Sequence, residues 1–245
     1  MIKKIIILPD VHLTDKVPKA YKVVKKFLST EFDWGKYDEV ILLGDFMDIS
    51  ALSHWDKDKR RVIEGKRYTQ ECDRANEELD FLQSVSKKVT YLEGNHENFV
   101  QRYLDYNPEL EGMVEVPNVL NLKKRKIDWV PMNKLYKKGK CYFTHGMYVN
   151  KYHANKHLQA LGCNIVYGHI HRVQQDMINM KMQDTITATA LGCLCDHSPH
   201  YMRGRPANWI NGFGIMYLDT KTGNFNLYPV NIIDNKFIWE GVKYQ

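Results

Sequence analysis

The sequence lacks any long uninterrupted hydrophobic run. A membrane-spanning helix needs roughly 20 apolar residues, and no stretch of the chain approaches that length. The lysines near the N-terminus precede an apolar run of Ile5–Leu8, which Pro9 and Asp10 end too early for the core of about 7–15 residues that a secretory signal requires. We therefore expect a cytoplasmic protein with no membrane partner, in which this N-terminal run forms a strand.

Cysteines are few and show no regular spacing. The five cysteines form an odd set, which suits a reducing compartment better than a disulfide framework. Cys193 and Cys195 are close enough in the sequence to contribute to a soft-metal site, but no second cysteine pair accompanies them. An ordinary structural role is the favoured interpretation for both.

Repeats, low-complexity segments and linkers rich in proline, glycine or serine are also absent, so no boundary divides the chain. We expect a single domain over residues 1–245. Its 44% hydrophobic and 26% charged residues are typical of a folded globular protein. The net charge of +6 and the pI of about 8.9 favour an anionic partner, such as a nucleotide or nucleic acid.

In the first half of the chain, strand-like runs alternate with helix-like segments. Short runs of Val, Ile and Leu predict buried strands, and apolar residues at helical spacing predict helices. The expected strands are residues 3–8, 39–44 and 88–94, and the expected helices are residues 19–29, 97–106 and most of 49–88. Such alternation indicates a parallel sheet covered by helices.

The second half has a different pattern. Residues 128–146 predict a hairpin that turns at Lys138 and Gly139, and residues 155–162 and 163–169 predict a short helix and a buried strand. Residues 212–232 predict two alternating strands around Gly223. We expect this half to form a second, more antiparallel sheet packed on the first.

Side chains that can bind metal follow five of the predicted strands, most of them beside a glycine that allows a tight turn. Sites in open α/β sheets collect outside the carboxyl ends of the strands, so we expect the five loops to converge. The loops LPDVH, LLGDFMD, LEGNHE, FTHG and VYGHIH supply Asp10, His12, Asp45, Asp48, Asn95, His96, Glu97, His145, His169 and His171.

This set of donors indicates a metal centre. Histidines combined with carboxylates and an amide suit divalent manganese, iron or zinc, whereas magnesium prefers oxygen ligands. The donors are too many for one tetrahedral ion, so we expect two ions that share one carboxylate, with Asp45 as the bridge. A structural role is the commoner one for a single buried histidine or aspartate, but it would have to recur in register at every one of these loops.

The ordered set D-x-H, G-D-x-x-D, G-N-H-E, H-G and G-H-x-H resembles the calcineurin-like metallophosphoesterase superfamily, over roughly Ile5 to His171. The chain is similar to the small stand-alone phosphoesterases of bacteria and phages. The resemblance implies an α/β fold, a four-layer αββα sandwich with two mixed β-sheets flanked by helices. It also implies two divalent metal ions, manganese first, with iron, zinc or nickel as alternatives.

Carried over by position, the resemblance implies a role for each residue. One metal would be held by Asp10, His12, Asp45 and His171, and the other by Asp45, Asn95, His145 and His169. His96 would protonate the leaving oxygen while a hydroxide bridging the metals attacks phosphorus, and Asp48 would accept a hydrogen bond from His96 and keep it charged. Glu97 is less certain and could simply cap the following helix.

The resemblance fixes the reaction better than the substrate. The second block reads GDFMDIS and lacks the arginine of the protein phosphatases in this superfamily, while His171, which those enzymes lack, is present. Both departures favour a phosphodiesterase that acts on nucleotides or nucleic-acid ends. The alternatives are a phosphomonoesterase and, in a different class, a non-catalytic nucleic-acid-binding or regulatory module with structural metals.

Candidates for substrate binding are fewer and weaker. His54 begins the long segment after the second block, Tyr148 and Lys151 follow the H-G block, and Arg203 and Arg205 lie in a loop after the strand ATALGC. His153 and His157 are four residues apart on a predicted helix, but no glutamate lies between them as in a zincin. An ordinary helix surface is the favoured interpretation for that pair. The sequence does not indicate the oligomeric state.

Overall fold

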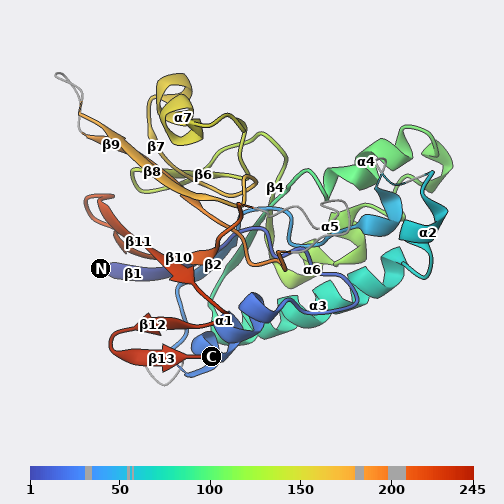
Figure 1. Cartoon of the computed structure of the whole chain (residues 1–245), viewed down its shortest axis with the longest axis horizontal. Coiled ribbons are helices and arrows are strands. Elements are labelled where there is room, and N and C mark those ends of the chain that lie inside the picture. Colours follow the sequence, from blue (N-terminus) through green and yellow to red (C-terminus); the bar gives the residue numbers. More distant parts are fainter. Residues whose placement is uncertain (31–34, 54–55, 57, 180–184, 198–207) are drawn as a thin grey trace.

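The computed structural model describes residues 1–30, 35–53, 56, 58–179, 185–197 and 208–245. Two large mixed sheets pack face to face, with helices outside each of them (Figure 1). This arrangement is the αββα sandwich expected from the resemblance. Within the described residues, no helix is both long and apolar enough to cross a membrane.

The first sheet has six strands in the order β11-β10-β1-β2-β3-β4. The strands β1 to β4 are parallel to one another, and β10 and β11 are added to the β1 edge as an antiparallel hairpin. Their bounds are β1 Ile2–Leu8, β2 Glu39–Leu42, β3 Val89–Leu92, β4 Asp128–Val130, β10 Asn211–Asp219 and β11 Phe225–Ile232.

The second sheet has five strands in the order β5-β6-β7-β9-β8. Its three central strands are parallel, while β5 and β8 pair antiparallel at the two edges. Their bounds are β5 Tyr136–Lys138, β6 Cys141–Thr144, β7 Asn164–Tyr167, β8 Val173–Ile178 and β9 Ile186–Leu191. A separate hairpin of β12 (Phe237–Trp239) and β13 (Val242–Tyr244) lies beside α1.

Helices cover the outer face of each sheet. On the first sheet these are α1 (Lys19–Thr30) and α3 (Tyr68–Val85), and on the second sheet it is α7 (His153–Leu161), which contacts β7, β8 and β9. Shorter helices complete the side of the first sheet, namely η2 Ser50–Leu52, α2 Arg60–Ile63, α4 Asn98–Leu104, η3 Pro108–Leu110, α5 Val116–Val119 and α6 Leu122–Arg125.

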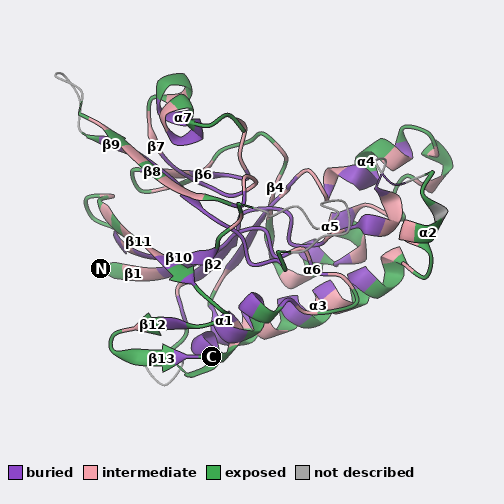
Figure 2. Cartoon of the chain, in the orientation of Figure 1, coloured by how far each residue is buried: buried purple, intermediate pink, exposed green. Residues whose placement is uncertain are grey.

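The alternation of side chains along the inner strands explains this layering. In β1, Ile6 and Leu8 pack with the helix-side core, while Ile5 and Ile7 pack between the two sheets. The strand is therefore buried on both faces, which is why its sequence is a continuous apolar run. Figure 2 shows the same burial along the other central strands.

The expected place of the tail strands was wrong, whereas the mostly helical character of residues 49–88 was confirmed. The tail strands join the first sheet and not the second, because residues 214–219 of β10 pair with residues 2–7 of β1. Alternating hydrophobicity shows that a strand has two unlike faces, but it does not identify the neighbouring strand. Residues 49–88 contain one long helix, α3, preceded by two short helical turns. Strand β8 and the β12–β13 hairpin were not anticipated.

Candidate metal centre

The loops that follow β1, β2, β3, β6 and β7 meet at one edge of the sandwich. Hydrogen bonds between main chains join them: the His12 N–H donates to Asp45 O at 2.8 Å, and the Gly168 N–H donates to His145 O at 2.9 Å. The Asp10 carboxylate links the two sheets, since it accepts the His169 N–H at 2.9 Å. The predicted convergence of the five loops is therefore present.

One group of donor atoms comes from the first and last of these loops, together with Asp45. His12 Nε2 and His171 Nε2 are 3.2 Å apart, and His171 Nε2 is 3.2 Å from Asp10 Oδ1. The Asp45 carboxylate completes the group, with Oδ2 lying 3.7 Å from His12 Nε2.

A second group surrounds His145 Nε2. This nitrogen is 2.9 Å from Asn95 Oδ1, 3.1 Å from His169 Nδ1 and 3.3 Å from Asp45 Oδ2. The same oxygen of Asp45 therefore faces both groups. That position is the one expected of a bridging carboxylate.

Hydrogen bonding within the second group cannot satisfy all of its atoms. His145 Nδ1 lies 2.8 Å from the main-chain oxygen of Leu43, which requires a proton on Nδ1 and leaves a lone pair on Nε2 in the neutral ring. That lone pair meets a carboxylate oxygen, an amide oxygen and another imidazole nitrogen. Such a set of acceptors fits a divalent cation of the manganese, iron or zinc type.

The charges of the site support the same conclusion. Burial alone would lower the pKa of His145, but the Asp45 carboxylate beside it raises that pKa to about 9. In the absence of metal, the buried Asp45 carboxylate thus draws a proton onto His145. A bound cation would replace those protons, so metal and proton compete for the same atoms.

The main chain is strained where it presents these side chains. Non-glycine residues rarely adopt a positive φ, yet five of the seven proposed ligands do. The φ angles are 42° at Asp10, 50° at His12, 48° at Asp45, 69° at His169 and 59° at His171. Backbone strain of this kind gathers at functional sites and persists only where the surrounding structure holds it.

Two glycines allow the carboxylates to come this close to the main chain. A Cβ atom on Gly94 would lie 2.2 Å from Asp45 Oδ1, and one on Gly168 would lie 2.1 Å from Asp10 Oδ2. No side chain fits at either position unless the carboxylate moves. The glycines of the G-N-H-E and G-H-x-H blocks are thus required by packing against the acids of other loops.

Glu97 has a larger structural role than capping a helix. It is 2% exposed, and its carboxylate accepts hydrogen bonds from the N–H groups of Asp45, Met47 and Gly94 and from the Tyr91 hydroxyl, at 2.7–3.0 Å. It thereby ties the G-D-x-x-D loop to the G-N-H-E loop. From the sequence alone, Glu97 could be identified only as an acid beside a histidine, and its hydrogen-bond partners could not be predicted.

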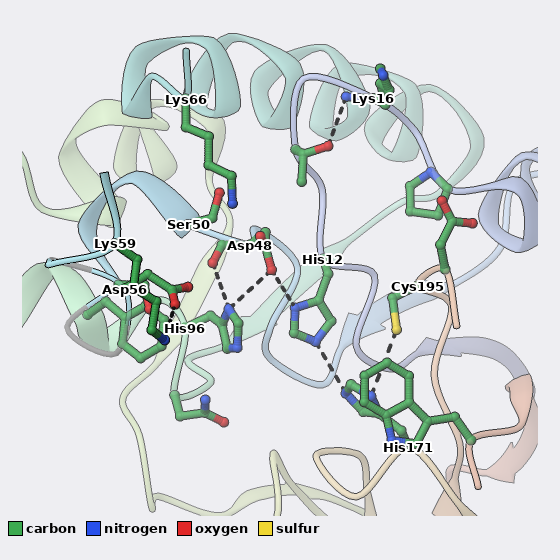
Figure 3. Close-up of a pocket in the computed structure, with 17 residues that line it drawn as sticks. His12, Lys16, Asp48, Ser50, Asp56, Lys59, Lys66, His96, His171 and Cys195 are labelled. Atoms are coloured by element: carbon green, nitrogen blue, oxygen red, sulfur yellow. Dashed lines mark hydrogen bonds and ion pairs between the residues drawn. The ribbon is translucent and has the colours of Figure 1, made fainter. Parts of the chain in front are cut away.

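Asp48 contacts two histidines. Its Oδ1 lies 3.2 Å from His12 Nδ1 and 3.4 Å from His96 Nδ1, while the shortest contact of His96 Nδ1, at 2.6 Å, is to the main-chain oxygen of Asp48 (Figure 3). Burial alone would lower the pKa of His96, but Asp45 and Asp48 raise it to about 10. The raised pKa of His96 favours the protonated ring, and the main chain of Asp48 shares in orienting it.

A cavity of about 600 Å³ opens beside His12, Asp48, His96 and His171. Its wall includes Lys16, Lys59 and Lys66 from two different segments, together with Phe99 and Trp209 (Figure 3). Lys59 pairs with Asp56 at 2.8 Å. The volume is within the range of small-molecule sites.

The candidate substrate-binding residues have separate outcomes. His54, Arg203 and Arg205 lie outside the described residues. Tyr148 and Lys151 do not line the cavity. The Tyr148 ring packs on His157 with a centroid distance of 5.0 Å, and Lys151 Nζ lies 5.3 Å from the centre of a neighbouring tyrosine ring.

His153 and His157 are not on a helix surface, so that interpretation was wrong. They are 1% and 0% exposed, because α7 presses this face onto the second sheet. His153 Nδ1 is 2.6 Å from the Tyr167 hydroxyl, and His157 Nε2 accepts the Met147 N–H at 3.2 Å. The pair supports the two loops that carry His145 and His169.

The fold and the clustered histidine and aspartate donors are those expected of a metal-dependent phosphoesterase. Residues 3–233 match the family model described as calcineurin-like phosphoesterase, and the chain belongs to this family. It is 25% identical to the Gene 54 protein of Mycobacterium phage L5 and 24% identical to that of phage D29, over 98% of each chain. Vps29 of Chaetomium thermophilum shares the fold, with a TM-score of 0.51 and 15% identity over 95% of this chain and 92% of that one.

Proposed function

We propose that the protein is a two-metal phosphodiesterase that acts on nucleotides or nucleic-acid ends. The observation that carries the proposal is the shared carboxylate: Asp45 Oδ2 lies 3.7 Å from His12 Nε2 and 3.3 Å from His145 Nε2. A single structural ion would need only one of the two donor groups around it. Two groups joined by one oxygen fit a pair of ions that act on one phosphoryl group.

The proposed ligands divide between the two positions. Asp10, His12, Asp45 and His171 would hold the first ion, and Asp45, Asn95, His145 and His169 the second. Manganese is the proposed metal, with iron, zinc or nickel as alternatives that the same nitrogen and oxygen donors accept. When bound, the ions would supply the Lewis acidity that activates water and neutralises phosphoryl charge.

His96 is proposed as the group that protonates the leaving oxygen. It lines the cavity but belongs to neither donor group, and its Nδ1 is engaged by Asp48. This leaves Nε2 as the atom that can reach a substrate. General-acid assistance of this type typically contributes about 10²–10⁴-fold to the rate, and most where the leaving group is a poor one.

Three features favour a diester over a monoester. Ile49 stands where the related protein phosphatases carry a phosphate-binding arginine, and His171 adds a histidine that those enzymes lack. The cavity continues past His96 toward Lys59 and Lys66, which leaves room for a second ester substituent. Lys66 and the net charge of +6 suit an anionic substituent such as a further nucleotide phosphate.

A phosphomonoesterase and a non-catalytic nucleic-acid-binding module are the competing functions. The module is disfavoured because a structural site has no need of His96, a partly buried acid that lines the cavity and belongs to neither donor group. The separating test is hydrolysis of bis-nitrophenyl phosphate against nitrophenyl phosphate by protein stripped of metal and reloaded with manganese. Faster turnover of the diester is expected. Preference for the monoester would reverse the assignment, and metal binding without turnover of either ester would favour the module.

A further inference from the structure

The sulfur of Cys195 lies against a proposed metal ligand. Cys195 Sγ is 3.8 Å from His171 Nδ1, within the range of a hydrogen bond to sulfur (Figure 3). Cys195 is 5% exposed and lines the same cavity as His171. Its sulfur, one nitrogen of His171 and one nitrogen of His12 all lie within 4.8 Å of one another.

The two nitrogens of His171 have different surroundings. Nε2 faces Asp10 Oδ1 and His12 Nε2, each at 3.2 Å, and so belongs to the donor group of the first ion. Nδ1 faces the sulfur, on the other side of the ring. A neutral imidazole carries one proton and one lone pair, so a proton on Nδ1 leaves the lone pair on Nε2.

The main chain around the cysteine is tied to the site from several directions. The Leu194 N–H donates to Asp10 O at 3.0 Å, which couples the cysteine loop to the loop of a proposed ligand. The Asn211 side-chain amide donates to Cys195 O at 2.8 Å, and the Ile210 N–H donates to His171 O at 2.8 Å. The thiol is therefore held in place by bonds that do not depend on the sulfur.

We propose that Cys195 positions His171, its sulfur accepting the Nδ1–H of the imidazole and so fixing the tautomer and ring orientation that direct Nε2 to the first ion. The inference rests on the proposed function, because it takes His171 as a metal ligand. Histidine ligands usually donate their outer N–H to a carboxylate, a carbonyl or water, and loss of that partner typically lowers metal affinity about 10–100-fold. Here a thiol takes that place.

The test compares wild-type protein with Cys195→Ala, Cys195→Ser and, as a control for loss of a buried thiol, Cys141→Ser. Cys141 is equally buried, but it lies at the start of β6, where its sulfur donates to the main-chain oxygen of Tyr142 at 3.6 Å. Metal-free samples are titrated with zinc against a competing chelator. Wild type and Cys141→Ser are expected to bind two ions alike, while Cys195→Ala binds one of its two about 10–100-fold more weakly. Cys195→Ser falls between them, because its shorter side chain leaves the oxygen farther from Nδ1.

Spectroscopy separates a positioning role from a merely structural one. In zinc-loaded wild type, long-range proton–nitrogen NMR is expected to show His171 protonated at Nδ1. In Cys195→Ala the Nδ1 chemical shift is expected to change, because its hydrogen bond to sulfur is lost. In cobalt-loaded wild type, no sulfur-to-cobalt charge-transfer absorption is expected. Its presence would overturn the proposal by making the sulfur a ligand.

The zinc titration distinguishes failure of the proposed two-metal function from failure of the role assigned to Cys195. If wild type binds fewer than two ions, the proposed function itself fails. If wild type binds two ions and Cys195→Ala binds both with unchanged affinity, the metal centre stands and the role of Cys195 is wrong.

Discussion

The two metal positions differ in the groups that contact the outer nitrogen, Nδ1, of their histidines. In the second position, His145 Nδ1 lies 2.8 Å from the Leu43 main-chain oxygen, at the end of a buried strand. In the first position, His12 Nδ1 meets the Asp48 side chain at 3.2 Å and His171 Nδ1 meets the Cys195 sulfur at 3.8 Å. The first partner is a main-chain oxygen one residue past β2, whereas the other two are side chains beside the cavity.

This difference predicts unequal behaviour of the two ions. The main chain at Leu43 is fixed by its own hydrogen bond to Leu8 O at 3.0 Å, while a carboxylate and a thiol can change rotamer. His12 and His171 also line the cavity, and His145 does not. We therefore expect the first ion to exchange more readily with solvent and chelators, and the second ion to remain as the more permanent part of the site.

The largest effect is expected from removing the side chain that both positions share. Asp45→Ala should abolish binding of both ions and lower turnover by more than about 1,000-fold, because its Oδ2 faces both donor groups. Metal content by mass spectrometry and hydrolysis of bis-nitrophenyl phosphate measure the two effects. Asp56→Ala is the control, since Asp56 lines the same cavity but pairs with Lys59. Retention of one ion in Asp45→Ala would show that the positions are independent.

His96→Asn should separate metal binding from chemistry. Both ions should stay, because His96 belongs to neither donor group, while hydrolysis of an alkyl phosphodiester falls by about 10²–10⁴-fold. A nitrophenyl ester should lose less, since its leaving group needs little protonation. Steady-state rates on the two esters, with metal content in parallel, measure this. Loss of an ion from the variant would mean that His96 is a ligand.

Glu97→Gln should weaken both positions together. Its carboxylate accepts bonds from Asp45, Met47, Gly94 and Tyr91, and an amide can accept at only one of its two atoms. The unmatched donors should lower the free energy of unfolding by about 1–3 kcal/mol. Urea denaturation and zinc titration are the measurements, with Glu93→Gln as a control on the same loop. Unchanged stability would contradict the bracing role.

The smallest effect concerns acid stability on the side of the second sheet. Burial, followed by the charges of His157 and Arg172, lowers the pKa of His153 from 6.5 to about 4. As the pH falls from 6.5 towards 4, His153 binds a proton in the unfolded chain but not in the folded chain. The free energy of unfolding therefore decreases across that window. Urea denaturation at pH 7.5 and 5 should show this loss, and His153→Gln should reduce it. An equal loss in the variant would assign it to other groups.

The strand-end patterns predicted the meeting of the five loops, whereas the four-layer sandwich was predicted from the family resemblance. The exits after Leu8, Leu42 and Leu92 had to share an edge once their strands were parallel. The sequence could not predict which groups contact the outer nitrogen of each histidine ligand. The contact of Cys195 with His171 depends on how β9 returns beside β7, which no periodicity encodes.

The same limit explains the misplaced tail and the buried histidine pair. Strand β10 joins β1, more than 200 residues away in the sequence, through main-chain bonds that any apolar strand could form. His153 and His157 occupy helical positions that look polar until α7 is packed on Tyr167. Partners of this kind are set by tertiary contacts and not by local pattern.

The most direct test of the central claim is a titration of metal-free protein with manganese, in which bound metal and diester hydrolysis are followed together. The shared carboxylate predicts that turnover rises only with the second equivalent and reaches its maximum at two ions per chain. Full activity at one equivalent, or no activity at two, would contradict the account of a two-metal phosphodiesterase.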